Sequence, residues 1–375
     1  MPNEAAVIDC DLLVIGAGIQ GTAVAYAAAQ RGYRVRVIEQ FSRPAEGTSS
    51  RSSKLIHGGL RYLETSQFRL VRECLQAQDD LLRDRPSLVK LTPFHIPVYA
   101  DTTRPAWKIS VGLWLYRALG GHRFTRVPEA EWNDLDGLDT RGLRTVFRYY
   151  DAQTDDRALT EAILADAQAL GVEVDFNTSF EQAECESTQC RVRCTGPEGE
   201  KEITAAALIN AAGPWVNHIL EHIKPHQTSL DIELVQGTHI IVPGTLKQGI
   251  YYLEAPQDKR AVFIMPWQGN IMIGTTETPY RGDPAGVQPL AEEKSYLLDV
   301  YNHYFSSKID PDDILDAFAG LRVLPASQGL AFNRPRDTIL HRDDTSPRLI
   351  SIYGGKLTSH AHTAREVMNM ISFAL

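Results

Sequence analysis

The sequence predicts an α/β fold that combines a parallel sheet with a mostly antiparallel one. Three features indicate this: a glycine-rich turn between a strand and a helix near the amino terminus, β-branched strands within residues 231–280, and a strand with two glycines before the last helix. The length of 375 residues and the hydrophobic content of 43% allow two or three domains, or one elaborate unit with a sizeable core.

A βαβ unit opens the chain. Residues 11–15 form an apolar run typical of a buried parallel strand, and Gly16-Ala17-Gly18-Ile19-Gln20-Gly21 follows directly. The alanine-rich run after it predicts a helix that ends at Gly32, and residues 34–38 predict the next strand. This order is typical of a Rossmann-type unit that binds a dinucleotide.

Each glycine of this turn has a separate expected role. Gly16 permits the tight turn, Gly18 lets the backbone approach a pyrophosphate, and Gly21 permits close packing of helix on strand. Glu39 ends the second strand, where its carboxylate can accept hydrogen bonds from a ribose diol and disfavours a 2′-phosphate. The unit alone does not distinguish NAD from FAD.

The stretch EGTSSRSSKLIHGGLRYLE, which ends at Glu64, favours the longer cofactor. A nicotinamide dehydrogenase usually continues directly into another α/β repeat after its ribose acid. Here the chain instead provides hydroxyls, glycines and cations, which suit a pyrophosphate and the approach to a reactive ring.

The middle of the chain predicts helices, a hairpin and a second small-residue turn. Helices are expected over residues 68–82 and from Asp155 or Asp156 to Leu170, with Gly171 as a left-handed stop. Residues 189–195 and 201–206 predict a hairpin. The following strand leads into Ala211-Ala212-Gly213, where backbone can approach a ligand closely; a merely tight strand exit is the alternative.

Residues 231–280 predict an antiparallel sheet that binds the substrate, with Gln268-Gly269-Asn270 as a hairpin turn. His239 lies among apolar residues of this sheet, so a structural core histidine is an alternative to a functional one.

Near the carboxyl end, residues 349–353 predict a strand, Gly354-Gly355 a turn, and Lys356-Leu357-Thr358-Ser359 the start of a helix whose N–H groups can face an anion.

The run SSKLIHGGLRYLE, with FRLVRE after it, resembles FAD-dependent glycerol-3-phosphate dehydrogenases of the D-amino-acid-oxidase-like flavoprotein superfamily. The resemblance continues through RPAWKISVGLWLY, YYDAQTDDRAL, INAAGPWVN, QGTHIIVP, FIMPWQGNIMIGTTE, AGLRVLP and YGGKLTS. It implies a glutathione-reductase-like FAD-binding domain of residues 1–90, 148–228 and 307–375. Residues 91–147 and 229–306 would form an interleaved substrate domain on a mostly antiparallel sheet.

The resemblance also implies which residues bind FAD. The expected cofactor residues are Gly16, Gly18, Gly21, Glu39, Thr48, Ser49, Ser50, Ser53, Lys54, His57, Gly58, Gly59, Ala211, Ala212, Gly213, Trp215, Gly354, Gly355, Lys356, Leu357 and Thr358.

The implied reaction is oxidation of sn-glycerol 3-phosphate to dihydroxyacetone phosphate, with a hydride passed to flavin N5 and electrons passed on to quinone or another acceptor. His239 is the expected base, with His57 as the second choice. The cations expected around the phosphate are Arg61, Arg322, Arg336 and Lys356, and Tyr62 is expected to bond the same group. The alternatives are an oxidase or dehydrogenase of another small hydroxy acid or amino acid, and a flavoprotein subunit that depends on a partner.

Some segments depart from the family pattern. The helical domain that usually follows GGKLT is not found after it, and Ser359, His360 and Ala361 replace the usual aromatic and basic residues. NRPRDTIL fits the family loop loosely, so Arg334 could take the place of Arg336. These departures favour a larger or different substrate as the alternative.

Charge and cysteines limit the partners. The net charge of −9 argues against nucleic acid, and the absence of a secretory leader or a long apolar run indicates a cytoplasmic protein. Five cysteines, with no paired histidines seen at ligand spacing, predict free thiols, no disulfide framework and no metal. Cys190 and Cys194 are expected on one face of a strand.

The run RPAWKISVGLWLYRALGG predicts a helix with apolar residues on all sides, which favours burial. The alternative is an interfacial helix that rests on the inner face of the cell membrane and delivers electrons to quinone. The oligomeric state is not predicted.

Overall fold

The computed structural model describes residues 8–326 and 338–371. The chain divides into two compact units, and each unit consists of segments that are not contiguous in sequence. The first unit comprises Met1–Ser50, Asp156–Leu234 and Leu321–Leu375, and the second comprises Arg51–Asp155 and Val235–Gly320. The expected domain boundaries differ from this division mainly at residues 51–90, which join the second unit because strand β3 (Leu55–Ile56) pairs with strand β6 (Leu143–Thr154).

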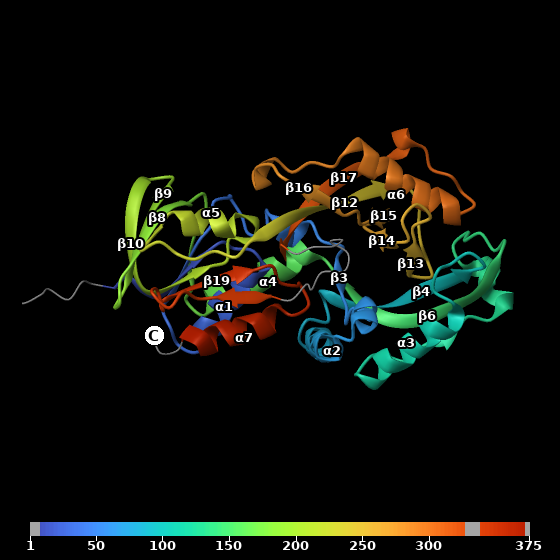
Figure 1. The fold of residues 1–375 in the computed structure, drawn as a ribbon, viewed down its shortest axis with the longest axis horizontal. Coiled ribbons are helices and arrows are strands. Elements are labelled where there is room, and N and C mark those ends of the chain that lie inside the picture. The colour runs from blue at the N-terminus through green and yellow to red at the C-terminus, as the bar shows by residue number, and fades with distance from the viewer. Residues whose placement is uncertain (1–7, 327–337, 372–375) are drawn as a thin grey trace, which may run out of the picture. The chain divides into compact units, whose positions relative to one another are not determined.

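The first unit is built on a nine-stranded sheet (Figure 1). Five strands run parallel in the order β7-β2-β1-β10-β19. Strand β9 extends the sheet by antiparallel pairing with β10, β8 pairs antiparallel with β9, and β18 pairs antiparallel with β19. The strands are β1 (Cys10–Ile15), β2 (Val35–Ile38), β7 (Glu173–Asp175), β8 (Ser179–Cys185), β9 (Cys190–Gly196), β10 (Gly199–Asn210), β11 (Ile223–Lys224), β18 (Ile339–His341) and β19 (Leu349–Tyr353).

Helices cover both faces of this sheet because its strands bury side chains alternately on each side. Leu12 and Val14 of β1 face a core shared with α1 (Ile19–Ala29), α4 (Asp156–Ala169) and α7 (His360–Ile371). Leu13 and Ile15 face the opposite core, to which α5 (Val216–Glu221) contributes. The near-continuous apolar strands are those expected of a parallel sheet buried on both sides.

The second unit contains most of a ten-stranded, mostly antiparallel sheet. Its longest pair is β4 with β6, and the parallel pair β13 with β4 joins this ribbon to the rest. The strands are β3, β4 (Val89–Tyr99), β5 (Thr125–Arg126), β6, β12 (Ile232–Val242), β13 (Ile250–Glu254), β14 (Ala261–Trp267), β15 (Asn270–Gly274), β16 (Thr278–Tyr280) and β17 (Asp316–Pro325).

Three helices supply the apolar cover of the second unit. Side chains of α2 (Phe68–Asp84) and α3 (Ala106–Ala118) join one buried cluster, and α6 (Ala291–Tyr304) contributes to another. The predicted helices over residues 68–82 and from Asp156, the predicted hairpin and the parallel and antiparallel sheets are confirmed. All five cysteines are buried free thiols, and Cys190 and Cys194 share one core as expected.

The expectation that α3 is buried on all sides is wrong. Trp107, Val111 and Trp114 are 68%, 52% and 62% exposed, whereas Leu113 and Tyr116 are buried. The exposed residues follow an i, i+4, i+7 spacing and therefore share one face of the helix. Among the residues that the structure describes, no helix is long and apolar enough to cross a membrane.

Candidate active site

The glycine turn after β1 has the geometry expected of a dinucleotide cradle. Gly16 has a φ of 101°, and a Cβ there would lie 2.8 Å from the carbonyl oxygen of Ala211. A Cβ on Gly21 would overlap the carbonyl oxygen of Gly16. The turn therefore tolerates only glycine at both positions, and it approaches the backbone of Ala211, just after β10, closely.

Glu39 supports this turn from the end of β2. Its carboxylate accepts hydrogen bonds from the backbone N–H groups of Ala17, at 2.6 Å, and Phe41, at 3.0 Å. Burial raises the pKa of this carboxyl, and the backbone N–H donors lower it in part. A carboxylate offers about four acceptor positions, so these bonds leave capacity for a ribose hydroxyl.

The hydroxyls of residues 48–50 hold the loop that follows β2. Ser49 Oγ accepts a hydrogen bond from the backbone N–H of Ile19 at 2.9 Å, and Thr48 Oγ1 donates to the carbonyl of Leu321 at 2.7 Å. Ser50 Oγ accepts from Arg157 at 3.2 Å. Thr48 and Ser49 thus fix the loop against the first turn of α1 and against β17.

Two more turns lie at the carboxyl ends of parallel strands. Ala211 continues β10, its N–H donating to the Ile15 carbonyl at 3.0 Å, and Trp215 packs edge-to-face on Phe41 with ring centroids 6.1 Å apart. After β19, the carbonyl of Lys356 accepts a hydrogen bond from Gln20 at 3.3 Å.

The first unit therefore brings together the predicted cofactor residues of the turns after β1, β10 and β19 at the carboxyl ends of its parallel strands. The predicted cofactor residues Ser53, Lys54, His57, Gly58 and Gly59 belong to the second unit. In open α/β sheets, ligands bind at the carboxyl ends of parallel strands. The glycine-lined turns after β1, β10 and β19, together with Glu39, fit the pyrophosphate and ribose of a dinucleotide.

In the second unit, the buried His239 pairs with the half-buried Ser53. His239 is 1% exposed, and its Nε2 lies 2.9 Å from Ser53 Oγ. The imidazole stacks on the Phe318 ring, with centroids 5.0 Å apart and an interplanar angle of 13°. On the other strand of the pair, β15 places Gly274 opposite His239, where any Cβ would overlap the imidazole ring. These contacts fix both the plane of the ring and the neighbour of Nε2.

Lys54 lies in the same part of the second unit. Its side chain is buried, with Nζ 5.1 Å from the centroid of Phe318 and 5.4 Å from that of Trp267. Its backbone φ is 61°. Contact with two aromatic faces stabilises a partly desolvated ammonium group. Sequence reasoning placed Lys54 among the residues that bind the cofactor and did not identify Phe318 or Trp267 as its neighbours.

A second buried network holds the turn at His57-Gly58-Gly59. The Gly58 N–H donates to Tyr116 Oη at 2.8 Å, and Tyr116 Oη donates to Asp151 at 2.6 Å. Gln78 bridges the Asp151 carboxylate, at 3.0 Å, and the Ile56 carbonyl, at 2.6 Å. Burial raises the pKa of Asp151 to about 7, although the Tyr116 and Gln78 donors lower it in part.

A third buried carboxylate, Glu293, lies beneath β12. It accepts hydrogen bonds from the hydroxyls of Thr238, Thr276 and Thr278 at 2.5–2.7 Å. Burial raises the pKa of this carboxyl, but the hydroxyl donors outweigh burial and the net pKa is lowered. Glu293 therefore fixes the backbone next to His239 with a carboxylate that stays ionised.

The predicted phosphate cations fall in different parts of the chain. Arg61 and Tyr62 belong to the second unit, with the guanidinium 5.9 Å from the Tyr62 ring centroid. Arg322 and Lys356 belong to the first unit, and both are half-buried. Arg336 and its alternative Arg334 lie outside the described residues.

Sequence reasoning missed Asp151, Tyr116, Gln78 and Glu293. Asp151 could have been predicted, because a lone carboxylate in the otherwise apolar strand around YYDAQ indicates a buried polar partner. The prediction that the chain has no histidine pair at ligand spacing is wrong, since His218 and His222 are four residues apart on and just after α5.

Comparison with known proteins places this chain. It matches the DAO family, described as FAD dependent oxidoreductase, over residues 11–370. It is 37% identical over 368 residues to a glycerol-3-phosphate dehydrogenase of Pseudomonas aeruginosa, covering 96% of this chain and 71% of that protein. It is 36% identical over 373 residues to D-erythritol 1-phosphate dehydrogenase of Brucella abortus, covering 96% and 73%.

A solved structure agrees with this placement. The glycerol-3-phosphate dehydrogenase from Bacillus halodurans, complexed with FAD, superposes with a TM-score of 0.78 at 26% identity. The match covers 97% of this chain and 64% of that one. The predicted α/β fold class is confirmed. With a sequence match along nearly its whole length and the corresponding fold, the chain belongs to the DAO family of FAD-dependent oxidoreductases.

Proposed function

We propose that this chain oxidises the secondary alcohol of sn-glycerol 3-phosphate to dihydroxyacetone phosphate. The observation that carries the proposal is the contact of buried His239 with Ser53, in a chain 35–37% identical to proteins named glycerol-3-phosphate dehydrogenase. A secondary alcohol needs a base for its hydroxyl proton and an acceptor for the carbinol hydride. The pair supplies a base, and a family of FAD-dependent oxidoreductases supplies the acceptor.

The first unit would hold FAD. The turn from Gly16 to Gly21 would bind the pyrophosphate through backbone N–H groups, and Glu39 would accept a hydrogen bond from the ribose. Ala211–Gly213 and Gly354–Thr358 would complete the cradle at the neighbouring strand ends. When bound, FAD supplies a two-electron acceptor for the carbinol carbon.

His239 would take the hydroxyl proton at Nε2. Ser53 Oγ occupies hydrogen-bonding distance of that atom, so it either relays the proton or aligns the ring before substrate enters. The stack on Phe318 holds the imidazole in one plane, which keeps Nε2 directed at Ser53. A fixed ring avoids the entropy cost of orienting the base during the reaction.

The anionic end of the substrate would be bound by cations. Arg61 and Arg322 are the guanidinium groups proposed for this role, because a planar guanidinium can bind two phosphate oxygens at once. Lys356 adds a further positive charge beside the last turn of the cradle, and Tyr62 would donate a hydrogen bond to the phosphate.

A second polyol phosphate is supported by one specific observation. The D-erythritol 1-phosphate dehydrogenase of Brucella abortus is almost as similar to this chain as the glycerol-3-phosphate dehydrogenases are. Both names describe a polyol carrying one phosphate, so the cation set and the base would serve either one. The difference between them is the length of the carbon chain.

The deciding experiment is anaerobic reduction of the bound flavin. Glycerol 3-phosphate should bleach the flavin of the purified protein, whereas glycerol, which lacks the phosphate, should not. D-erythritol 1-phosphate and a 2-amino acid complete the panel. Bleaching by the amino acid but by neither phosphate would overturn the proposal, and faster bleaching by erythritol 1-phosphate would reassign the substrate.

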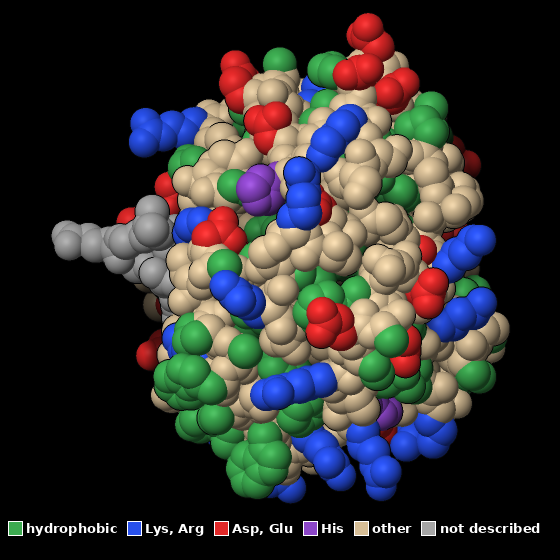
Figure 2. Space-filling view, turned by 90° about the vertical axis from the view of Figure 1, so that its right-hand side faces the viewer, with side chains coloured by type: hydrophobic (Ala, Val, Ile, Leu, Met, Phe, Trp, Pro, Cys, Tyr) green, Lys and Arg blue, Asp and Glu red, His purple; other side chains and the backbone are tan. Residues whose placement is uncertain are grey.

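We also propose that α3 docks on the inner face of the cell membrane and that quinone accepts the electrons. Trp107, Val111 and Trp114 form an exposed apolar face, and Lys108 and Arg117 of the same helix are exposed. Figure 2 shows hydrophobic side chains beside Lys and Arg side chains in the lower part of one face of the molecule. Aromatic and basic residues together are typical of helices that bind anionic lipid surfaces.

Flotation with anionic liposomes tests this docking. The protein should float with the vesicles, and Trp107→Glu/Trp114→Glu should stay at the bottom. Leu170→Glu, which changes an exposed leucine outside α3, serves as the control and should float. A wild-type protein that stays wholly at the bottom contradicts the docking.

A further inference from the structure

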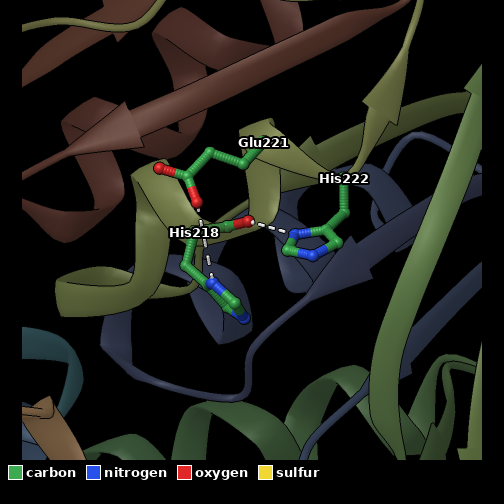
Figure 3. A group of neighbouring side chains, drawn as sticks. All are labelled: His218, Glu221 and His222. Atoms are coloured by element: carbon green, nitrogen blue, oxygen red, sulfur yellow. Dashed lines mark hydrogen bonds and ion pairs between the residues drawn. The ribbon is translucent and has the colours of Figure 1, made fainter.

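Three metal-ligating side chains gather on the surface of the first unit. His218 and Glu221 lie on α5, and His222 follows the last residue of that helix (Figure 3). All three are exposed. Glu221 and His222 lie three and four residues after His218, which places each of them beside His218 on the helix surface. The proposed oxidation makes no use of them.

The distances between the three suit a small cation. One candidate ligand atom from each lies within 4.8 Å of the others, and His218 Nδ1 lies 3.9 Å from a Glu221 carboxylate oxygen. Zinc binds nitrogen and oxygen ligands at about 2.0–2.2 Å, so tetrahedral ligands lie roughly 3.4 Å apart. For the ring nitrogens that lie nearest, the separations exceed this spacing by about 1.4 Å at most, and exposed side chains can rotate to bring a ring nitrogen of each histidine to the cation.

His222 already has the outer contact of a metal-bound histidine. Its Nδ1 lies 2.9 Å from the backbone carbonyl oxygen of His218, an atom that can only accept a hydrogen bond. Nδ1 therefore carries the proton in the neutral ring, and Nε2 keeps its lone pair. Metal-ligating histidines usually donate their second ring N–H to a carbonyl or carboxylate in this way, which fixes the tautomer and orients the ring.

We infer that His218, Glu221 and His222 form a binding site for a divalent transition metal of the zinc class. Two imidazoles and one carboxylate are the ligands of an open zinc site, in which water or another ligand takes the fourth position. Imidazole selects zinc, copper and nickel over magnesium and calcium, which prefer oxygen ligands. The site is open to solvent, so the cation enters without any opening of the fold.

The site lies close in sequence to the proposed cofactor cradle. The turn Ala211–Gly213 leads through Trp215 directly into α5, and Ile219 and Leu220 anchor the helix in the core. A cation that bridges the end of this six-residue helix to its third residue would stabilise a helix too short to persist alone. Metal binding is therefore expected to raise the thermal stability of the protein, by an amount that grows with the logarithm of the free metal concentration above Kd.

The experiment uses the flavin-loaded full chain after removal of metal with a chelator. Calorimetric titration with zinc chloride should show one equivalent bound, and cobalt(II) should give the visible absorption of a low-coordinate nitrogen and oxygen site. His218→Ala and His222→Ala should each weaken zinc binding by at least about tenfold. Glu221→Gln should weaken zinc binding less than either alanine variant, because the amide oxygen can still coordinate the cation, although less strongly than a carboxylate.

Matched controls separate this site from general histidine binding. His226→Ala removes an exposed histidine just after the cluster, and His362→Ala removes the half-buried histidine that lies 3.3 Å from Glu366 on α7. Neither variant should change zinc affinity. Bound equivalents that persist in His218→Ala/His222→Ala, or that fall equally in His226→Ala, would overturn the inference, as would the absence of any stoichiometric heat.

Activity distinguishes this inference from the proposed function. His218→Ala/His222→Ala should keep its flavin and reduce it with glycerol 3-phosphate at the rate of the unchanged protein, since the cluster takes no part in that reaction. Failure of the substrate assignment would leave the zinc titration unaffected. Conversely, failure of zinc binding would leave the oxidation intact.

Discussion

The cofactor cradle of the first unit and the His239–Ser53 pair of the second unit are built from different materials. The cradle consists of backbone turns, and its key positions are glycines that admit no Cβ. The pair consists of side chains from residues 186 positions apart in the sequence. A substitution in the cradle should therefore prevent cofactor binding through steric overlap. A substitution in the pair should slow the reaction while the fold and the bound cofactor remain intact.

The cradle is the part expected to show the largest effect. Gly21→Val would force a side chain into the Gly16 carbonyl, so the turn could not close against β1. We expect the purified variant to contain no flavin, as measured by its visible absorption after gel filtration. Gly112→Ala is the matched control, because a Cβ there meets nothing and the position is helical. Full flavin content in Gly21→Val would show that the close contact does not matter for cofactor binding.

Substitutions in the His239–Ser53 pair should instead lower the rate of flavin reduction. His239→Gln removes the base, and loss of a general base typically costs about 10²–10⁴-fold in rate. We expect anaerobic flavin reduction by glycerol 3-phosphate to slow by that range while the flavin content stays normal. Ser53→Ala should have a smaller effect if Ser53 only aligns the ring. A rate in His239→Gln within about twofold of the unchanged protein would remove His239 from the proposed role.

The difference between a site made of local backbone turns and one made of side chains distant in sequence also decides what the sequence could predict. Gly16, Gly21 and Glu39 were predictable because a single local motif, read with its flanking strands and helix, states the backbone geometry that requires them. The strands of the antiparallel sheet and the helix at Asp156 were predictable from periodicity and capping residues.

The side-chain networks were not predictable, because their members meet only through the tertiary pairing of strands. Ser53 was predicted only as a cofactor residue, and the contact of its hydroxyl with His239 was not foreseen. Gly58 depends on Tyr116 and Asp151, which come from α3 and β6. The exposed face of α3 was only the alternative expectation, since an all-round apolar helix resembles a buried one until its neighbours are known.

The smallest expected effect concerns Asp151, a buried side chain of the second unit. It is a change in how the free energy of unfolding depends on pH. In the folded protein Asp151 keeps its proton up to about pH 7, whereas the ordinary carboxyl value is 3.8. Between these values the unfolded chain binds fewer protons, so stability should fall as pH rises from about 4 to about 7.

Asp151→Asn cannot titrate and should flatten that part of the profile, while its amide oxygen still accepts from Tyr116. Urea midpoints at pH 5 and pH 7.5 provide the measurement. Asp155→Asn, four residues along the chain, is the control and should keep the slope of the unchanged protein. An identical slope in Asp151→Asn would mean that the carboxyl releases its proton as readily in the folded chain as in the unfolded one. The network around Gly58 would then hold a charged group within a buried site by hydrogen bonds alone.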